Sequence, residues 1–375
     1  MLQTFENHLD VLWAFLVALG VVIVLTPAVG RVARVLGIVD EPLERRRIHL
    51  QAVPRLGGLA LFLGVFVSSL AFLDLSGPYR GILLGAAVAT TVGMVDDFRG
   101  LPWWGKLAGQ SAAAAIAIDF GVRIDRFTFP IVGIHDLPFW SGVILTLIWI
   151  VAIMNMVNLL DGLDGLAAGI CMISGATFAI IALSLGKPEA AVLSATIAGA
   201  CLGFLRHNFY PARIFMGDSG ALLLGFVLGV IPLQGLLKTA SIVTLFFPLL
   251  VLAVPIIDTS FVVLRRLKYG ESPFTADQTH LHYRFLRRGF TQRRAAVTIW
   301  AWCGTLAAAA LTVRFVRPHR HGEWHEWRTL ITAAVGFVAL AASLYIVYIL
   351  EIVKLTSLRS RRREAQPAER TRRTA

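Results

Sequence analysis

The sequence predicts an all-α polytopic membrane protein with about eleven transmembrane helices, and three observations support this fold class. Apolar residues make up 57% of the 375 residues, and charged residues make up only 15%. Soluble domains carry roughly 25% charged residues, which they need to cover their surface. Apolar runs also recur along most of the chain, each near the ~20 residues that one membrane crossing requires.

The expected helices follow one another in a single integral membrane domain, residues 1–356. The apolar runs lie near residues 11–30, 56–75, 79–95, 106–122, 138–158, 164–185, 189–205, 219–236, 240–264, 294–313 and 329–353. Residues 123–137 are too polar to span and alternate in places, which predicts a short hairpin on the outer side. Residues 357–375 are expected to form a basic, disordered cytoplasmic tail.

The distribution of basic residues predicts the orientation. Lys and Arg collect after the first run, between the ninth and tenth runs, and in the tail. An odd number of spans places these three regions on one side, which the positive-inside rule makes the cytoplasm. The amino terminus is then outside and the carboxyl terminus inside. The net charge of +12 would favour nucleic-acid binding in a soluble protein. Here the positive-inside distribution accounts for it, so we expect no nucleic-acid partner.

Aspartates stand at the cytoplasmic ends of the predicted helices. Asp96 and Asp97 close the third run, Asp161 and Asp164 end the fifth, and Asp218 precedes the eighth. Carboxylates beside apolar segments are costly unless they are paired, hydrated or bound to a metal. Their common depth therefore predicts a shared site. Helix capping is the alternative for a single aspartate, such as Asp218, and it explains the whole set less well.

A polar edge runs along the end of the fifth predicted helix. Asn155, Asn158, Asp161 and Asp164 recur every three residues, and this spacing puts them on one drifting helix face. Mg²⁺ prefers such oxygen donors and usually takes one or two carboxylates together with substrate phosphates. We therefore expect Mg²⁺, with Mn²⁺ as the alternative ion.

Basic and amide side chains lie near the same face. His280, His282 and Arg284 precede the tenth run and could form a cationic cradle for an anionic substrate. A solvated basic loop is the alternative for the arginine. The other candidates for substrate binding are Lys106, Arg206 and Asn208. Snorkelling, headgroup contact or helix-end capping could equally explain these three residues.

Two other classes of protein are polytopic as well. A secondary transporter needs ionisable groups near the middle of the bilayer and usually has interrupted, repeated segments. The aspartates here gather at one surface instead. A non-catalytic scaffold for glycan assembly would leave these aspartates without a purpose.

Four strings make the sequence similar to a known family. They are VDDFRGLPWWGKLAGQ, NMVNLLDGLDGLAAG, FLRHNFYPARIFMGDSGALLLG and THLHYRFLRRG. In this order they resemble the polyprenyl-phosphate N-acetylhexosamine-1-phosphate transferase superfamily, over roughly residues 35–295. The resemblance implies transfer of a sugar 1-phosphate from a UDP-N-acetylhexosamine, with GlcNAc as the expected sugar, to undecaprenyl phosphate. UMP is released, and the lipid-linked sugar begins a cell-envelope glycan. It further implies the bacterial inner membrane, an active site facing the cytoplasm, and a homodimer.

The resemblance also implies roles for individual residues of the site. Asp96 and Asp97 would lie near the metal and the lipid phosphate, and Asp218 would bind the metal. The string His-Leu-His-Tyr departs from the family pattern, because Tyr283 stands where sugar transferases usually have a further histidine. Pro-Arg-Leu-Gly-Gly likewise differs from the turn of the peptidoglycan branch, so we expect the chain to lie outside that branch. The predicted catalytic residues are Asp96, Asp97, Asp161, Asp164 and His282; the substrate-binding residues are Asn158, Lys106, Arg206, Asn208, His280 and Arg284; and the metal ligands are Asp218 and Asp97.

Overall fold

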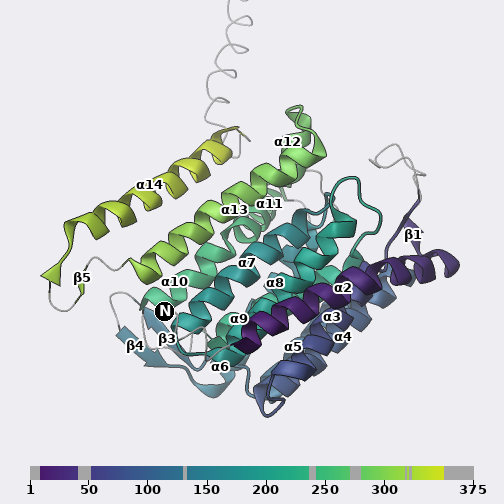
Figure 1. Cartoon of the computed structure of the whole chain (residues 1–375), viewed down its shortest axis with the longest axis horizontal. Coiled ribbons are helices and arrows are strands. Elements are labelled where there is room, and N and C mark those ends of the chain that lie inside the picture. Colours follow the sequence, from purple (N-terminus) through teal and green to yellow (C-terminus); the bar gives the residue numbers. More distant parts are fainter. Residues whose placement is uncertain are drawn as a thin grey trace, which may run out of the picture.

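The computed structural model describes residues 9–40, 52–129, 133–235, 242–270, 280–316, 319–320 and 323–349. The predicted tail, residues 357–375, lies outside the described residues. Helices dominate the described part of the chain, and most lie side by side in one bundle (Figure 1). They are α2 (Leu9–Val35), α3 (Gly57–Phe72), α4 (Pro78–Arg99), α5 (Trp103–Asp119), α6 (Phe139–Leu160), α7 (Leu166–Ser184), α8 (Pro188–Asn208), α9 (Gly217–Gly235), α10 (Ile242–Val251), α11 (Ala253–Tyr269), α12 (Leu281–Arg287), α13 (Gln292–Phe315) and α14 (Glu326–Ile349).

Within the described residues, 8 helices are long and apolar enough to cross a membrane. This confirms an all-α polytopic membrane protein. The number eleven stays a prediction, because α3 has 16 residues and α5 has 17. The predicted ninth run is divided at Leu252, between α10 and α11. Pro255 explains the division, since a proline ring clashes with the carbonyl group four residues earlier, here Val251, while it is tolerated in the first turn of a new helix.

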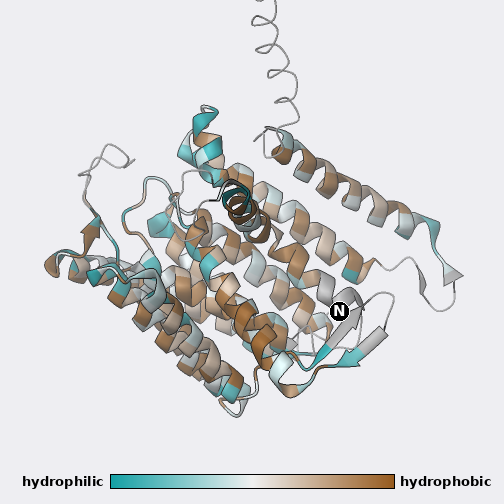
Figure 2. Ribbon diagram, turned by 180° about the vertical axis from the view of Figure 1, so that it is seen from behind, coloured by the Kyte–Doolittle hydropathy of each residue, from teal (hydrophilic) through white to brown (hydrophobic). Residues whose placement is uncertain are grey.

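Hydrophobic residues cover the helix surfaces, and hydrophilic residues gather at helix ends and around α12 (Figure 2). The core centres on α9, which is almost wholly buried among α3, α4, α6, α7 and α8. A helix that is apolar on all sides is expected in such a position. In contrast, α14 is largely exposed and packs mainly against α13 (Figure 1).

Close helix contacts bring α3 and α4 against the start of α9. A Cβ atom at Gly93 of α4 would overlap the backbone of Ser219, and one at Gly58 of α3 would overlap the backbone nitrogen of Gly220. Helix axes approach this closely only where the side chain is a single hydrogen atom. These contacts fix the position of the amino-terminal end of α9.

Short strand pairs connect the helices. The antiparallel pair of β3 (Arg126–Phe129) and β4 (Gly133–Asp136) confirms the hairpin expected within residues 123–137. It lies at the end of the bundle opposite α12 (Figure 1). A salt bridge of 2.9 Å joins Arg126 and Asp136, which are opposite each other in the register. The other pairs are β1 (Val39–Asp40) with β2 (Val53–Pro54), and β5 (His319–Arg320) with β6 (Glu323–Trp324).

Candidate active site

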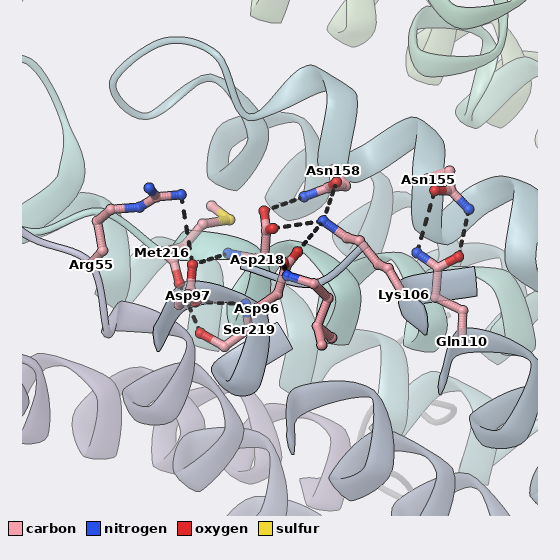
Figure 3. A network of polar contacts seen from close by, with 11 residues as sticks. Arg55, Asp96, Asp97, Lys106, Gln110, Asn155, Asn158, Met216, Asp218 and Ser219 are labelled. Atoms are coloured by element: carbon pink, nitrogen blue, oxygen red, sulfur yellow. Dashed lines mark hydrogen bonds and ion pairs between the residues drawn. The ribbon is translucent and has the colours of Figure 1, made fainter. Parts of the chain in front are cut away.

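Polar side chains from four helices meet at one end of the bundle (Figure 3). They come from the last turn of α4, the first turn of α5, the last turn of α6 and the first turn of α9. Because these neighbouring helices alternate in direction, the end of one lies beside the start of the next. The structure thereby brings together Asp96, Asp97 and Asp218, which the sequence placed at a common depth.

Lys106 of α5 lies at the centre of this network. Its Nζ is 2.8 Å from Asp96 Oδ2 and 2.6 Å from Asp218 Oδ2, and it donates to Asn158 Oδ1 at 3.0 Å. Asn158 Nδ2 in turn donates to Asp218 Oδ1 at 2.7 Å. One ammonium group therefore compensates two carboxylates that would otherwise repel each other at short range. Asp96 is held further by the Leu101 backbone N–H, which donates to its Oδ1 at 2.6 Å.

Asp97 anchors the start of α9. Its two carboxylate oxygens accept the backbone N–H groups of Asp218 at 2.9 Å and Ser219 at 3.0 Å. A carboxylate stabilises a helix amino terminus because it satisfies unpaired N–H groups and faces the positive end of the helix dipole. Gly217, with φ +67°, permits this approach, since a Cβ there would overlap Asp97 Oδ2. The Asp97 side chain is fully buried, with Arg55 Nη2 3.7 Å away. This geometry favours an anchoring role over the predicted metal contact.

Beside the network lies a cavity of about 270 Å³. Four carboxylates and one guanidinium group face it, together with amides, an aromatic ring and a phenol. The side chains that line it include Asp40, Arg55, Asn158, Asp161, Asp164, Asn208, Phe215, Asp218, Tyr283 and Gln292. Lys106 and Asp96 are not among the lining residues, whereas Asp218 and Asn158 belong to both the network and the cavity lining.

Asp161 follows α6 directly and is half-buried in the cavity wall. Loss of water contact, with the charges of Asp218 and Asp97 and against the opposing effect of Arg55, raises its pKa to about 7. Near neutral pH this carboxyl group can therefore take up or give up a proton.

Asp164 and Asn208 line the cavity but also hold its walls together. Asp164 Oδ2 accepts the backbone N–H of Ala212 at 2.9 Å. Asn208 accepts the Gly165 N–H at 3.0 Å and donates to the Ile214 carbonyl at 2.9 Å. These bonds tie the turn after α6 to the segment between α8 and α9, which is a structural use of both predicted residues.

The predicted histidines lie side by side near the cavity. Asp258 of α11 accepts from Leu281 N at 2.7 Å, and its other oxygen lies 2.9 Å from His280 Nδ1. The rings of His280 and His282 are parallel within 7°, with centroids 5.9 Å apart. Gly162 leaves room for the His282 ring, because a Cβ there would overlap Nε2. His280 is thus engaged by Asp258 rather than placed in the cavity lining.

His282 is almost fully buried, and within the described residues neither ring nitrogen has a hydrogen-bond partner. Burial, together with the neighbouring His280 and against the opposing charge of Asp258, lowers its pKa to about 4. The ring is therefore neutral near pH 7 and does not supply the positive charge that the sequence suggested.

Two predicted substrate-binding residues lie away from the cavity lining. Arg206 is exposed in the last turn of α8. The Arg284 guanidinium lies 4.5 Å from the ring centroid of Phe261 on α11, a cation–π distance. Spacing along the chain placed both near the site, but each side chain follows the face of its own helix.

Sequence reasoning missed several residues of this region. Asp258 carried a usable signal, because an acidic residue inside an apolar run is costly unless it has a partner. Arg55 lies in a short loop whose position depends on contacts with Asp40 and Asp97. Gln292 gave no signal, since it reads as an ordinary first residue of a helix.

Comparisons with known proteins add independent findings. The model of glycosyl transferase family 4 matches residues 79–236, which include Asp96, Lys106, Asn158 and Asp218. A probable undecaprenyl-phosphate N-acetylglucosaminyl 1-phosphate transferase of Bacillus subtilis (strain 168) is 37% identical over 79% of this chain and 82% of its own length. A decaprenyl-phosphate N-acetylglucosaminephosphotransferase of Mycobacterium leprae is 34% identical over 79% of this chain and 82% of its own length. An undecaprenyl-phosphate alpha-N-acetylglucosaminyl 1-phosphate transferase of Escherichia coli (strain K12) is 30% identical over 75% of this chain and 76% of its own length.

Proposed function

This chain belongs to glycosyl transferase family 4 and to the polyprenyl-phosphate N-acetylhexosamine-1-phosphate transferases, and from this premise we propose the reaction that it catalyses. The protein transfers N-acetylglucosamine 1-phosphate from UDP-N-acetylglucosamine to undecaprenyl phosphate and releases UMP. The single observation that carries the proposal is the Lys106 ammonium held between Asp96 and Asp218, beside a cavity that Arg55 also lines.

The chemistry requires two anions to meet. A lipid phosphate oxygen forms a bond to the sugar-bearing phosphorus of the donor, and the bond from that phosphorus to the bridging oxygen breaks, so that UMP leaves with the electron pair. A phosphomonoester has a second pKa near ~6, so the acceptor is largely dianionic at neutral pH. Charge compensation and alignment are therefore the main tasks of the site.

The residues of the chain can perform these tasks. Arg55 and Lys106 supply fixed positive charge near Asp218, and Asn158 holds Asp218 in place. Asp96, bound to Lys106, would position the lipid phosphate or accept a proton from it. Asp161 exchanges a proton near neutral pH, and its ionised form would be the one that binds a cation.

The cavity suits a divalent cation. Within the described ranges no three His, Cys, Asp or Glu side chains are placed to hold a metal by themselves. Mg²⁺, however, usually takes one or two carboxylates and completes its shell with water and phosphate. Asp218 and Asp161, which both line the cavity, would hold it, and Mn²⁺ would fit the same donors. When bound, the ion would offset the charge of the diphosphate.

The proposed setting is the bacterial inner membrane, with the site facing the cytoplasm and the product beginning a cell-envelope glycan. The site lies at the same end of the bundle as α12, which carries Arg284 and Arg287. The positive-inside rule favours the cytoplasm for such a face. The homodimer stays a prediction.

The test uses the purified chain with UDP-N-acetylglucosamine, undecaprenyl phosphate and Mg²⁺, and measures UMP release. We expect turnover by the wild type, its loss in Asp218→Asn, and normal turnover in Asp74→Asn, an exposed aspartate that follows α3. A folded wild-type protein that releases no UMP under these conditions would refute the proposed reaction. Transport of a solute without UMP release would favour the transporter alternative.

A further inference from the structure

Gln292, the first residue of α13, carries a buried amide without a partner. Its exposed fraction is 7%, and it lines the cavity described above. Neither Nε2 nor Oε1 has a hydrogen-bond partner in the described part of the chain. Leaving a buried polar group unsatisfied costs roughly 1–3 kcal/mol, and buried side-chain amides are therefore paired in most proteins.

The chain satisfies another buried glutamine of the same region. Gln110 of α5 exchanges two hydrogen bonds with Asn155 of α6, at 3.3 Å and 2.7 Å (Figure 3). Gln110 thus has its partners within the fold, whereas the amide of Gln292, a residue of the cavity lining, has none among the described residues. Gln292 offers one donor and one acceptor side by side.

The position of Gln292 is fixed by its neighbours. The Thr291 side chain caps α13 by accepting the Arg294 N–H at 3.3 Å. The Arg293 guanidinium lies 5.7 Å from the ring centroid of Phe209, and the Phe209 ring packs against Gly165. Gln292 therefore belongs to the part of the cavity near Gly165, whereas Arg55 belongs to the part near Asp218.

An aromatic ring lies in the same cavity wall. Tyr283 of α12 lines the cavity and packs on the His282 ring, with centroids 4.3 Å apart. An aromatic face together with an unpartnered carboxamide suits a planar ligand that carries its own carbonyl and N–H groups.

We propose that Gln292, beside Tyr283, recognises a planar group of the donor that carries neighbouring carbonyl and N–H groups, and so selects the donor. This inference rests on the proposed function. Two parts of UDP-N-acetylglucosamine have this chemistry, namely the uracil ring and the N-acetyl group. Charged residues near Asp218 would bind the diphosphate, while Gln292 would read an uncharged group.

The experiment compares the dissociation constants of UMP, UDP-N-acetylglucosamine and UDP-glucose for the wild type and Gln292→Met, by calorimetry on purified protein. If Gln292 reads uracil, the variant binds all three ligands about tenfold more weakly, the change expected for one lost hydrogen bond. If it reads the N-acetyl group, only UDP-N-acetylglucosamine loses affinity. Unchanged affinity for all three ligands would overturn the inference.

A stability measurement separates recognition from packing. Methionine removes an unsatisfied amide without leaving a cavity, so the thermal midpoint of ligand-free Gln292→Met should equal or exceed that of the wild type. A lower midpoint together with unchanged affinity for all three ligands would identify a merely structural residue and refute the proposal. Thr291→Ala is the matched control, since it weakens the cap of α13 and should lower the midpoint without changing the affinity for any of the three ligands.

Turnover of the wild type is measured in parallel with the same donor and undecaprenyl phosphate. Absent turnover refutes the proposed function itself. Normal wild-type turnover with unaltered Gln292→Met binding refutes only the role of Gln292.

Discussion

Lys106 Nζ lies 2.6 Å from Asp218 Oδ2, although the two residues are 112 positions apart in the sequence. The contact joins the start of α5 to the start of α9, and Asp96 joins it from the end of α4. The side chains of Lys106 and Asp218 are only 18% and 24% exposed, so bulk solvent screens their charges weakly.

Removal of the Lys106 charge should therefore damage both function and folding. In Lys106→Met, Asp96 and Asp218 lose their shared countercharge, and breaking a largely buried pair costs roughly 3 kcal/mol or more. We expect UMP release to fall at least a hundredfold and the thermal midpoint to fall as well. Lys187→Met, at the opposite end of the bundle, is the control. A variant that keeps wild-type turnover would contradict the central place of Lys106.

Substitutions of Asp97 and Asp218 should have different effects on stability and on turnover. Asp97→Asn replaces one acceptor of the α9 N–H groups with a donor, so the free energy of unfolding should fall by roughly 1–3 kcal/mol. Asp218→Asn leaves that anchor intact and should lose turnover with a smaller change in stability. Paired measurements of thermal midpoint and UMP release test both statements. Equal midpoints for the two variants would argue against the anchoring role of Asp97.

The contact between Gly93 and Ser219 predicts a steric effect. Gly93→Ala introduces a methyl group into the backbone of α9, and overpacking of this kind costs roughly 1–3 kcal/mol. Both the thermal midpoint and the turnover should decrease, because α4 and α9 carry opposite sides of the site. The control is Gly304→Ala, where the space around the new Cβ is open. If Gly93→Ala behaves like the control, the close helix contact is not needed.

The lowered pKa of the buried His282 ring should make the protein less stable in acid. Its pKa is about 4 in the folded protein, below the ordinary 6.5, because burial disfavours the charged ring. The unfolded chain therefore binds a proton between these values that the folded chain does not bind. The folded state therefore keeps its full free energy of unfolding above pH 6.5. As the pH falls toward 4, protonation of His282 in the unfolded chain lowers that free energy by roughly 3 kcal/mol.

The measurement is the thermal midpoint between pH 7.5 and 4.5 for the wild type and His282→Gln. The variant should lose less stability over this interval, because glutamine does not titrate. Asp258 and His280, which face His282, are present in both proteins, so the difference between the two curves reports on the His282 ring. Parallel curves for the two proteins would show that His282 does not contribute in this way.

Much of the site was predictable because helix ends are visible in the sequence. Asp96, Asn158 and Asp218 each mark the end of an apolar run, and alternating helix directions then place these ends together. The hairpin near residues 126–136 was also predictable, because local alternation of polar and apolar residues is visible in the sequence. No contact between distant elements was needed for either inference.

The remaining features depend on contacts that spacing does not encode. Asp97, in the last turn of α4, faces α9, whereas Asp161, directly after α6, faces the cavity. The sequence places both residues at the end of a helix and does not distinguish these two positions. Arg55 reaches the site only because the segment between β2 and α3 brings its guanidinium to 3.7 Å from Asp97 of α4. The division of the predicted ninth span at Leu252 could have been expected from Pro255, but hydropathy alone does not reveal it.

The enclosure of α9 has a consequence for access. Over almost its whole length this helix is covered by neighbouring helices, so Asp218 lies at the end of a buried column. The phosphate of a membrane lipid would therefore have to approach this carboxylate at the end of the bundle and not between α9 and its neighbours.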